Sequence, residues 1–184
     1  DVVNELNKWG QDNLHKVDFI DMSEVRSGSV SDEDDCRICD LKAEFNRQIN
    51  SSSAVIFIVG DKTCIRTAGG ECERIDKYQW QCHCTPYKKN VNGVKNCKVF
   101  NMLISGENDD FGEINRCSYL RHEFEQAKKK KKTIIIVYNS TRRESYWLPS
   151  YMKGYENEAK PFWKINDRGE RVGDYAYIKE VLGF

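Results

Sequence analysis

Two uninterrupted apolar runs constrain the fold of this 184-residue chain more than any other feature of its sequence. They are AVIFIVG at residues 54–60 and TIIIVYNS at residues 133–140, and each has the length of a β-strand. A strand with one face in water alternates apolar and polar residues, whereas a strand covered on both faces is continuously apolar. Both segments therefore predict buried strands of the kind that parallel sheets contain.

Apolar residues at helical spacing predict helices before, between and after these strands. The predicted helices cover residues 2–9, 31–49, 118–130 and 173–184, with a short helix inside 142–152 that stops near Pro149. Further strands are predicted at residues 16–23 and 160–165, the second at a sheet edge because Pro161 lies near its start. Alternating helices and strands imply right-handed crossovers and a mostly parallel sheet. The sequence thus predicts one α/β domain over residues 1–184, with helices on both faces of the sheet.

Two features depart from the regular alternation. A doubly wound sheet normally opens on a strand, so we expect a first strand upstream of residue 1. Residues 61–117 separate the first apolar strand from the helix that follows it, and connections in compact domains are usually far shorter. Within this insertion, residues 77–87 and 96–104 can pair as a hairpin around the turn dipeptide Asn92-Gly93. We expect a small β-rich insertion there.

Composition excludes several classes of partner. Lys and Arg together number 29 and Asp and Glu together number 29, so no surplus of positive charge predicts binding to nucleic acid or membrane. No apolar run approaches the roughly 18 residues of a transmembrane helix. The chain has eight cysteines and opens without a secretory signal, which favours reduced thiols in a cytoplasmic protein.

The insertion at residues 61–117 carries cysteines that raise the alternative of a structural zinc site. The candidate ligands are Cys64, Cys72, Cys82, Cys84 and Cys97. Four cysteine ligands can hold zinc in a tetrahedron, but these spacings match no standard zinc finger. We therefore favour free thiols and predict no metal cofactor, with structural zinc as the alternative.

Candidate ligand-binding residues follow the ends of the predicted strands. In open α/β sheets, ligands bind beyond the carboxyl ends of the strands. Asp21 and Ser23 end the predicted strand at 16–23, and Gly60 ends the first apolar run. Glu123 lies near the start of the helix at 118–130, where it can point into the same cleft.

Glu123 also admits a structural interpretation. It lies one step around the helix from a predicted apolar stripe, which comprises Leu120, Phe124 and Ala127. A glutamate at such a margin can be solvated, or it can pair with Arg121 or with a lysine of the run at 128–132. Position alone leaves both interpretations open.

The motif YLRHE at residues 119–123, followed by FEQA, a basic stretch and a strand, resembles the aromatic-x-x-x-Glu helix start of TIR domains. Residues 17–32 resemble their second strand and its mobile loop, and residues 51–63 resemble their third strand. The pattern is most similar to the TIR-like family of bacterial antiphage systems of the Thoeris type, and the tail over 145–184 also resembles members of that group. Two departures are the missing first strand and Tyr119, where many members carry Trp.

This resemblance implies a three-layer flavodoxin-like fold and cleavage of the nicotinamide–ribose bond of NAD. It assigns the catalytic carboxylate to Glu123, and we add Gly60 at the sheet edge to the substrate-binding residues Asp21, Ser23 and Tyr119. Losing nicotinamide leaves an oxocarbenium-like ribose, which a nearby carboxylate stabilises. Core packing for Tyr119 and loop capping for Asp21 remain alternatives. NAD is then a substrate, and no bound cofactor is required.

The nucleophile decides the product, because water gives ADP-ribose and an adenine nitrogen gives a cyclic ADP-ribose. The resemblance also implies self-association and a nucleotide signal to a downstream effector. Two other functions fit the sequence. One is a non-catalytic TIR-type protein–protein interaction module, and the other is a nucleoside deoxyribosyltransferase-like enzyme with a nucleophilic glutamate.

Overall fold

The computed structural model of the chain describes residues 1–12, 14, 17–22, 34–65, 75–76, 81–82 and 118–184. The chain forms two compact units. The first comprises residues 1–24, 51–66 and 127–184, and the second comprises residues 25–50 and 67–126. The first unit contains a parallel sheet, and the second contains a pair of helices.

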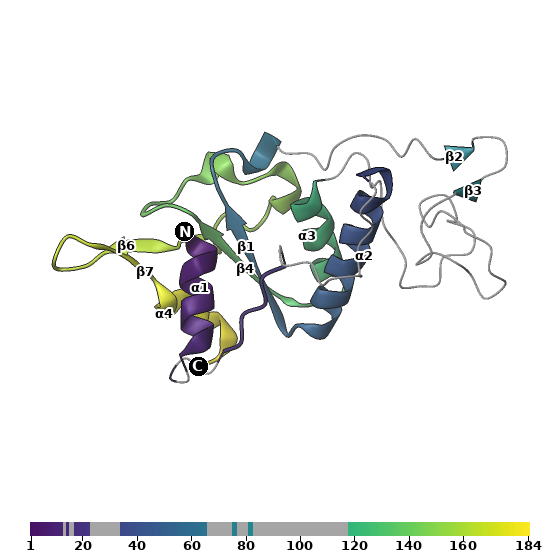
Figure 1. Cartoon of the computed structure of the whole chain (residues 1–184). Helices are drawn as coiled ribbons and strands as arrows, with labels where there is room; N and C mark the ends of the chain where they lie inside the picture. Colours follow the sequence, from purple (N-terminus) through teal and green to yellow (C-terminus); the bar gives the residue numbers. More distant parts are fainter. Residues whose placement is uncertain (13, 15–16, 23–33, 66–74, 77–80, 83–117) are drawn as a thin grey trace. The chain divides into compact units, whose positions relative to one another are not determined.

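The first unit is built on a three-stranded sheet with the order β1-β4-β5 (Figure 1). β1 is Ala54–Val59, β4 is Thr133–Tyr138 and β5 is Lys160–Pro161. β1 and β4 are parallel and pair along their full length, with Phe57 in register with Ile136. β5 is also parallel to β4. The two apolar runs are therefore neighbouring parallel strands, and the prediction of a mixed α/β chain with a parallel sheet is confirmed.

The position of each strand in the sheet explains its burial. β4 lies between β1 and β5, and its last four residues are buried, including Val137 on one face and Tyr138 on the other. Along β1, every second residue is buried and the residues between are half-buried. Cover on both faces is thus confirmed for β4 and only in part for β1, which is an edge strand among the described residues.

Two terminal helices pack into one hydrophobic cluster on this sheet. They are α1 (Val2–Gln11) and α4 (Tyr175–Leu182), both predicted from their apolar spacing. The cluster comprises Val2, Leu6, Trp9, Ile135, Val137, Phe162, Trp163, Tyr175 and Ile178. The Trp9 ring lies 4.3 Å from the Tyr175 ring and 5.4 Å from the Phe162 ring, between centroids. Aromatic contacts of this kind stabilise beyond the burial of area alone.

The structure divides the single edge strand predicted over residues 160–165 at Phe162. β5 precedes the division, and β6 (Trp163–Ile165) follows it as half of an antiparallel hairpin with β7 (Arg171–Gly173). Phe162 turns the chain, because its side chain is buried while its N–H donates to the Tyr138 carbonyl. The sequence missed β7, whose three residues carry no strand periodicity.

Gly173 brings β7 into close contact with α1. A Cβ atom at this position would lie 2.5 Å from the Trp9 ring, closer than such contacts ever come. Only glycine therefore allows the hairpin to approach the helix at this point.

The predicted strand at residues 16–23 is wrong over its described part. Residues 17–22 form no strand, although Val17 and Phe19 pack against the hydrophobic cluster while Ile20 is exposed. The alternation is that of a strand, but the backbone runs against α1, where a Cβ at Gly10 would lie 3.3 Å from the Phe19 nitrogen. An extended segment packed on a helix shows the same pattern as a strand without joining a sheet.

The short helix predicted inside residues 142–152 is two 3-10 turns. They are Ser145–Trp147 and Ser150–Met152, on either side of Pro149. Leu148 is held in extended geometry, with ψ at 121°, because the ring of a following proline disfavours the helical region. A helix cannot continue through that residue.

The second unit contains α2 (Asp34–Ser51) and the start of α3 (Tyr119–Lys129), and both predicted helices are confirmed. Within the insertion, β2 (Ile75–Asp76) and β3 (Gln81–Cys82) form a short antiparallel pair. β structure in the insertion is thus confirmed over these four residues. The rest of the proposed hairpin around Asn92-Gly93 lies outside the described residues.

A Schellman motif ends α3 within the lysine run. The Lys132 N–H donates to the Ala127 carbonyl and the Lys131 N–H donates to the Lys128 carbonyl, each over 3.0 Å. Lys131 has φ at 52°, in the left-handed region that glycine occupies more readily. The Lys132 side chain donates to the Ser52 carbonyl, which links this end of α3 to the start of β1.

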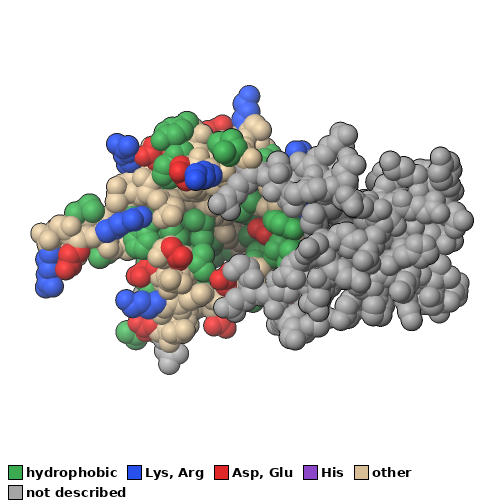
Figure 2. Space-filling model, turned by 45° about the horizontal axis from the view of Figure 1, so that its top comes forward, with side chains coloured by type: hydrophobic (Ala, Val, Ile, Leu, Met, Phe, Trp, Pro, Cys, Tyr) green, Lys and Arg blue, Asp and Glu red, His purple; other side chains and the backbone are tan. Residues whose placement is uncertain are grey.

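The described residues on the face shown in Figure 2 carry charges of both signs. On the face shown in Figure 2, basic and acidic side chains alternate, and no large area carries a single sign. Among the described helices, none has the length and apolar character that crossing a bilayer requires.

Candidate functional site

Glu123 lies at the centre of the buried half of α3. At about 100° per residue, Tyr119 and Ala127 lie about 40° to either side of it, and Leu120 and Gln126 lie about 60° away. Ala127 and Gln126 are buried, and the other two are half-buried. The sequence placed Glu123 at the margin of the apolar stripe, because it did not show that the polar side of the helix is also buried.

The opposite side of α3 is exposed and carries its own ion pair. Arg121 Nε lies 2.8 Å from Glu125 Oε1, and both side chains are about half exposed. The predicted ion pair between Glu123 and Arg121 is therefore not found in the structure. The guanidinium group binds the glutamate one turn later.

Burial raises the pKa of the Glu123 carboxyl from 4.5 to about 8, and desolvation is the cause. Part of the Glu123 residue remains accessible to solvent. The pKa is raised because protein atoms surround the carboxyl and replace most of its water. Among the residues whose side chains are described, no ion pair reaches Glu123, and desolvation is the one cause of the shift. At neutral pH the carboxyl is therefore mostly protonated.

Tyr119, one turn before Glu123, contacts α2 through its ring. The ring meets the Phe45 ring edge-on at 5.7 Å between centroids, and the Lys42 ammonium lies 5.9 Å from the ring centroid. Phe45 and Lys42 are both buried. These contacts give Tyr119 a packing role, and its role as a wall of a substrate pocket stays a prediction.

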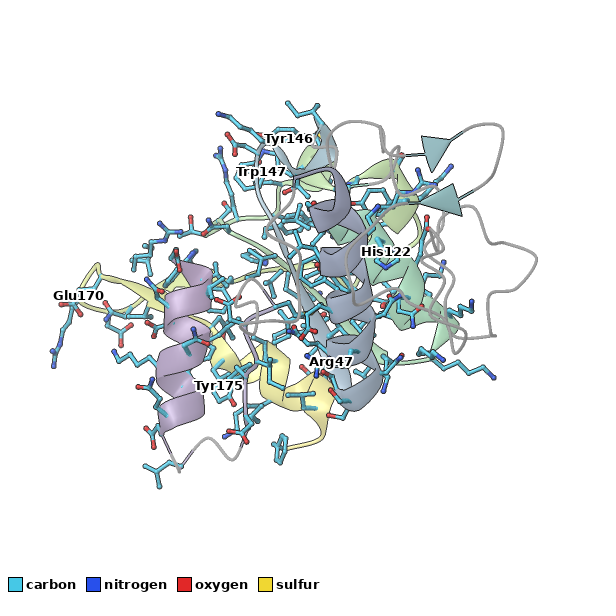
Figure 3. The ribbon with its side chains drawn as sticks, turned by 45° about the vertical axis from the view of Figure 1, so that its right-hand side comes forward. Arg47, His122, Tyr146, Trp147, Glu170 and Tyr175 are labelled. Carbon is cyan, nitrogen blue, oxygen red and sulfur yellow. The ribbon has the colours of Figure 1, made fainter. Side chains whose placement is uncertain are left out.

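Two side-chain bonds join α2 to α3, and we call them the rungs. His122 Nε2 lies 2.9 Å from Asn46 Oδ1, and Gln126 Nε2 donates to Asn50 Oδ1 over 3.1 Å. His122 and Gln126 are four residues apart on α3, and so are Asn46 and Asn50 on α2, which places the rungs one turn apart. Figure 3 shows His122 beside the two helices.

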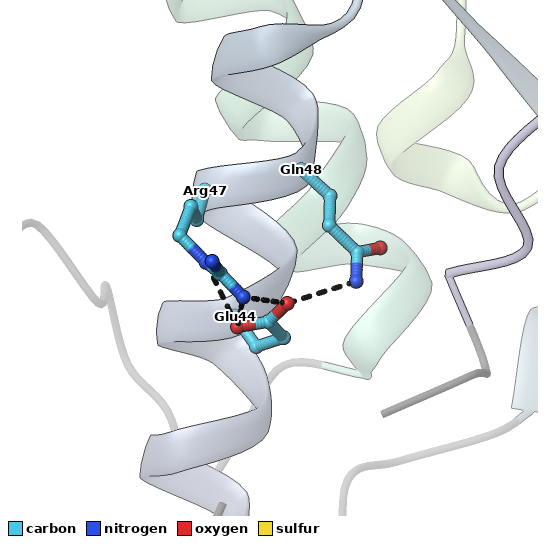
Figure 4. Close-up of polar contacts among 3 residues, drawn as sticks. All are labelled: Glu44, Arg47 and Gln48. Atoms are coloured by element: carbon cyan, nitrogen blue, oxygen red, sulfur yellow. Dashed lines mark hydrogen bonds and ion pairs between the residues drawn. The ribbon is translucent and has the colours of Figure 1, made fainter. Parts of the chain in front are cut away.

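Further polar side chains are buried along α2. Glu44 is buried and accepts from Arg47 Nε and from Gln48 Nε2, each over 3.0 Å (Figure 4). Lys42 is fully buried as well. Buried polar groups are tolerated where their bonds are made, so the described interior of this unit combines hydrogen-bonded polar side chains with the buried apolar residues Phe45, Ile49 and Phe124.

The remaining predicted site residues belong to the first unit or lie outside the described residues. Asp21 is half-buried at the end of the extended segment that packs on α1. Gly60 follows β1, and its N–H donates to Thr63 Oγ1 over 2.8 Å, which starts a 3-10 turn at Thr63–Ile65. Ser23 lies outside the described residues. The structure brings Tyr119 and Glu123 together on one helix, while Asp21 and Gly60 belong to the other unit.

Of the five cysteines proposed as alternative zinc ligands, the structure describes the side chain of one. Cys64 is an exposed free thiol. The side chains of Cys72, Cys82, Cys84 and Cys97 lie outside the described residues. Where side chains are described, no three histidine, cysteine or acidic groups gather in a metal-binding cluster. Structural zinc in the insertion stays an untested alternative.

The sequence missed the rungs and with them the polar surroundings of the candidate carboxyl. The only available signal is the pairing of polar residues four apart, at 46 and 50 and at 122 and 126. Solvated helix faces show the same spacing, so the signal does not distinguish a buried rung from a surface pair.

Comparison with known proteins gives no relative. No family model, no curated protein and no solved structure matches this chain. The structure defines the class as a mixed α/β protein with a three-stranded parallel sheet. Its desolvated glutamate lies on α3, the helix that precedes β4 in the sequence.

Proposed function

We propose that this chain is a TIR-like enzyme, with a flavodoxin-like three-layer fold, that cleaves the nicotinamide–ribose bond of NAD. The observation that carries the proposal is the state of Glu123, a desolvated carboxyl without an ion-pair partner among the described residues. It lies one turn after Tyr119 on the helix that leads into β4. Strongly perturbed carboxyls of this kind concentrate at functional sites.

The chemistry needs one carboxylate. The bond between ribose C1′ and the nicotinamide nitrogen breaks, its electron pair leaves with nicotinamide, and the ribose becomes oxocarbenium-like. A carboxylate in a site of low dielectric stabilises that charge more strongly than it does in water. Nicotinamide is cationic in NAD and leaves as a neutral molecule, so no general acid is required. Water then adds to C1′ and loses a proton to give ADP-ribose, or an adenine nitrogen adds to give a cyclic product.

The raised pKa of Glu123 sets the pH dependence of this reaction. The free protein holds the carboxyl mostly protonated at pH 7, and the reaction uses the ionised form. The cationic nicotinamide ring of bound NAD favours ionisation of a nearby acid. We therefore expect kcat/KM to rise with pH and to level off above the pKa of about 8, because kcat/KM reports the free enzyme.

The same proposal, a TIR-like enzyme that cleaves NAD, also implies the substrate-binding residues, the cellular location and the signalling role. Tyr119 borders the nicotinamide–ribose half of NAD, and the resemblance of the sequence to TIR domains is the basis for proposing Asp21 and Ser23, with Gly60, as further substrate-binding residues. We place the protein in the cytoplasm of a bacterial cell, where it self-associates and signals to an effector through its nucleotide product.

The test is nicotinamide release from NAD by the purified protein, measured by chromatography and mass spectrometry. We expect Glu123→Gln to lower kcat at least about 100-fold, because the variant cannot supply the negative charge. Glu125→Gln is the matched control on the same helix, because Glu125 is exposed and paired with Arg121, and we expect it to retain activity.

Two results would overturn the proposal. Equal release by the wild type and Glu123→Gln would remove the carboxylate from the reaction. Absence of release by the wild type as monomer and as concentrated assembly would leave the non-catalytic interaction module as the better function. Base exchange on deoxynucleosides, with indifference to NAD, would instead support the deoxyribosyltransferase-like enzyme.

A further inference from the structure

We infer that the two rungs between α2 and α3 hold the Glu123 carboxyl in place, with His122 and Gln126 as its positioning residues. The catalytic consequence rests on the proposed function. The positioning itself is a property of the helix pair and can be measured without any substrate.

The two rungs act together because both hydrogen bonds are donated by α3 and accepted by α2. Asn46 Oδ1 can only accept, so His122 Nε2 carries the proton and donates, and Gln126 Nε2 donates to Asn50 in the same way. Both donors lie on α3 and both acceptors lie on α2. Because the rungs are one turn apart, turning α3 about its axis or sliding it along α2 breaks both bonds at once.

This rigidity bears directly on Glu123. The rungs flank it on one side, with Gln126 about 60° and His122 about 100° away around the helix. The apolar stripe flanks it on the other side, where Phe124 is about 100° away and is buried. With the rungs made, Glu123 lies midway across the buried half of α3. A turn of about 100° would carry its carboxyl to the border with solvent, where the exposed pair of Arg121 and Glu125 begins.

The simpler explanation is that the rungs only satisfy buried polar groups. Loss of stability on mutation cannot separate the two explanations, because both predict it. The pKa of Glu123 separates them, since it reports how far the carboxyl is withdrawn from water.

The experiment compares His122→Leu with His122→Gln. Leucine removes the donor at similar bulk, and glutamine retains an N–H donor near the position of Nε2, as Gln126 does in the second rung. Arg121→Gln, on the exposed side of the same helix, is the control. The Glu123 pKa is followed by the side-chain carboxyl carbon signal in protein labelled at glutamate, with Glu123→Gln to assign the signal.

We expect His122→Leu to lower the Glu123 pKa by at least about one unit, because the carboxyl gains access to water. His122→Gln and Arg121→Gln should leave it within a few tenths of a unit of the wild type. In the NAD assay, the pH midpoint of kcat/KM should fall with the pKa in His122→Leu and return in His122→Gln.

A folded His122→Leu variant with an unchanged Glu123 pKa would overturn the inference, because the rung would then be structural only. If His122→Leu does not fold, Gln126→Met cuts the second rung and has the same two outcomes. Loss of the fold in both variants would also overturn it, since the rungs would then serve stability as a whole. A wild type that releases no nicotinamide would defeat the proposed function while leaving the pKa comparison valid.

Discussion

The two compact units of this protein bury different kinds of side chain. In the first unit, α1, α4 and β4 meet in a cluster of aliphatic and aromatic residues, with Trp9 between Phe162 and Tyr175. In the second unit, the described interior of the helix pair is mixed: Phe45, Ile49 and Phe124 are buried there, and so are Glu44 and His122, which form hydrogen bonds. Figure 3 labels Tyr175, which belongs to the cluster of the first unit, and His122, which lies on α3.

The difference matters because apolar and polar interiors do different things. Apolar burial stabilises in proportion to area and has little directional preference. Hydrogen bonds in a poorly solvated interior require particular geometry and therefore specify how the helices are oriented. The unit that carries the candidate carboxyl thus adds two hydrogen bonds between α2 and α3 to its apolar contacts, and such bonds favour one orientation of the helices.

The largest effect that would test this comparison is Phe162→Ala in the first unit. Phe162 is fully buried, so we expect the free energy of unfolding to fall by about 3–5 kcal/mol through lost transfer energy and the cavity left behind. Urea denaturation followed by far-UV circular dichroism measures the loss. Ile165→Ala, at a residue that is 57% exposed, is the control and should change stability little. Similar losses in the two variants would show that the first unit does not depend on its apolar cluster.

The next effect concerns the pH dependence of stability through Glu123. The folded pKa of about 8 lies above the unfolded value of 4.5, so the folded state retains a proton that the unfolded state releases. The stabilisation by this proton is complete below pH 4.5 and is lost as pH rises to about 8. Glutamine mimics the neutral acid, so Glu123→Gln should match the wild type closely at pH 4.5 and be more stable at pH 9, by about 4 kcal/mol.

Denaturation curves of both proteins across that pH range measure the divergence. Glu125→Gln should follow the wild type throughout, because Glu125 is exposed. If the free energy of unfolding changed with pH in the same way in Glu123→Gln and in the wild type, Glu123 would be solvated. The difference between the two interiors would then have no bearing on the proposed active site. A variant that is more stable and inactive is the combination that a catalytic carboxyl predicts.

The smallest effect is at the end of α3. Lys131 adopts a left-handed conformation in the Schellman motif, which costs a non-glycine residue about 1 kcal/mol. Lys131→Gly should therefore raise the free energy of unfolding by up to about 1 kcal/mol, less the greater entropy of glycine in the unfolded chain. Thermal unfolding measures it, and Lys129→Gly, at the last residue of the helix, should lower stability instead. If Lys131→Gly were as destabilising as Lys129→Gly, the strain at Lys131 would be absent.

The sequence predicted most of the first unit, because that unit depends on apolar periodicity. The runs at 54–59 and 133–138 and the helical spacing in α1 and α4 are each contained within a short stretch of chain. The mistakes fall where distant contacts decide. Val17 and Phe19 alternate like strand residues but pack on a helix, and Phe162 ends a strand because its side chain enters the cluster.

For the candidate site, the sequence determined the residue types, the α3 helix and the position of Glu123 beside an apolar stripe. Only the tertiary structure decided that Glu123 is desolvated and that His122 and Gln126 form hydrogen bonds with residues 76 positions earlier in the chain. Hydrophobic periodicity indicates which side of a helix is polar. It does not indicate whether the polar side chains are solvated or form hydrogen bonds with another helix. The identity of those partners follows from the packing of two helices, which no single stretch of sequence contains.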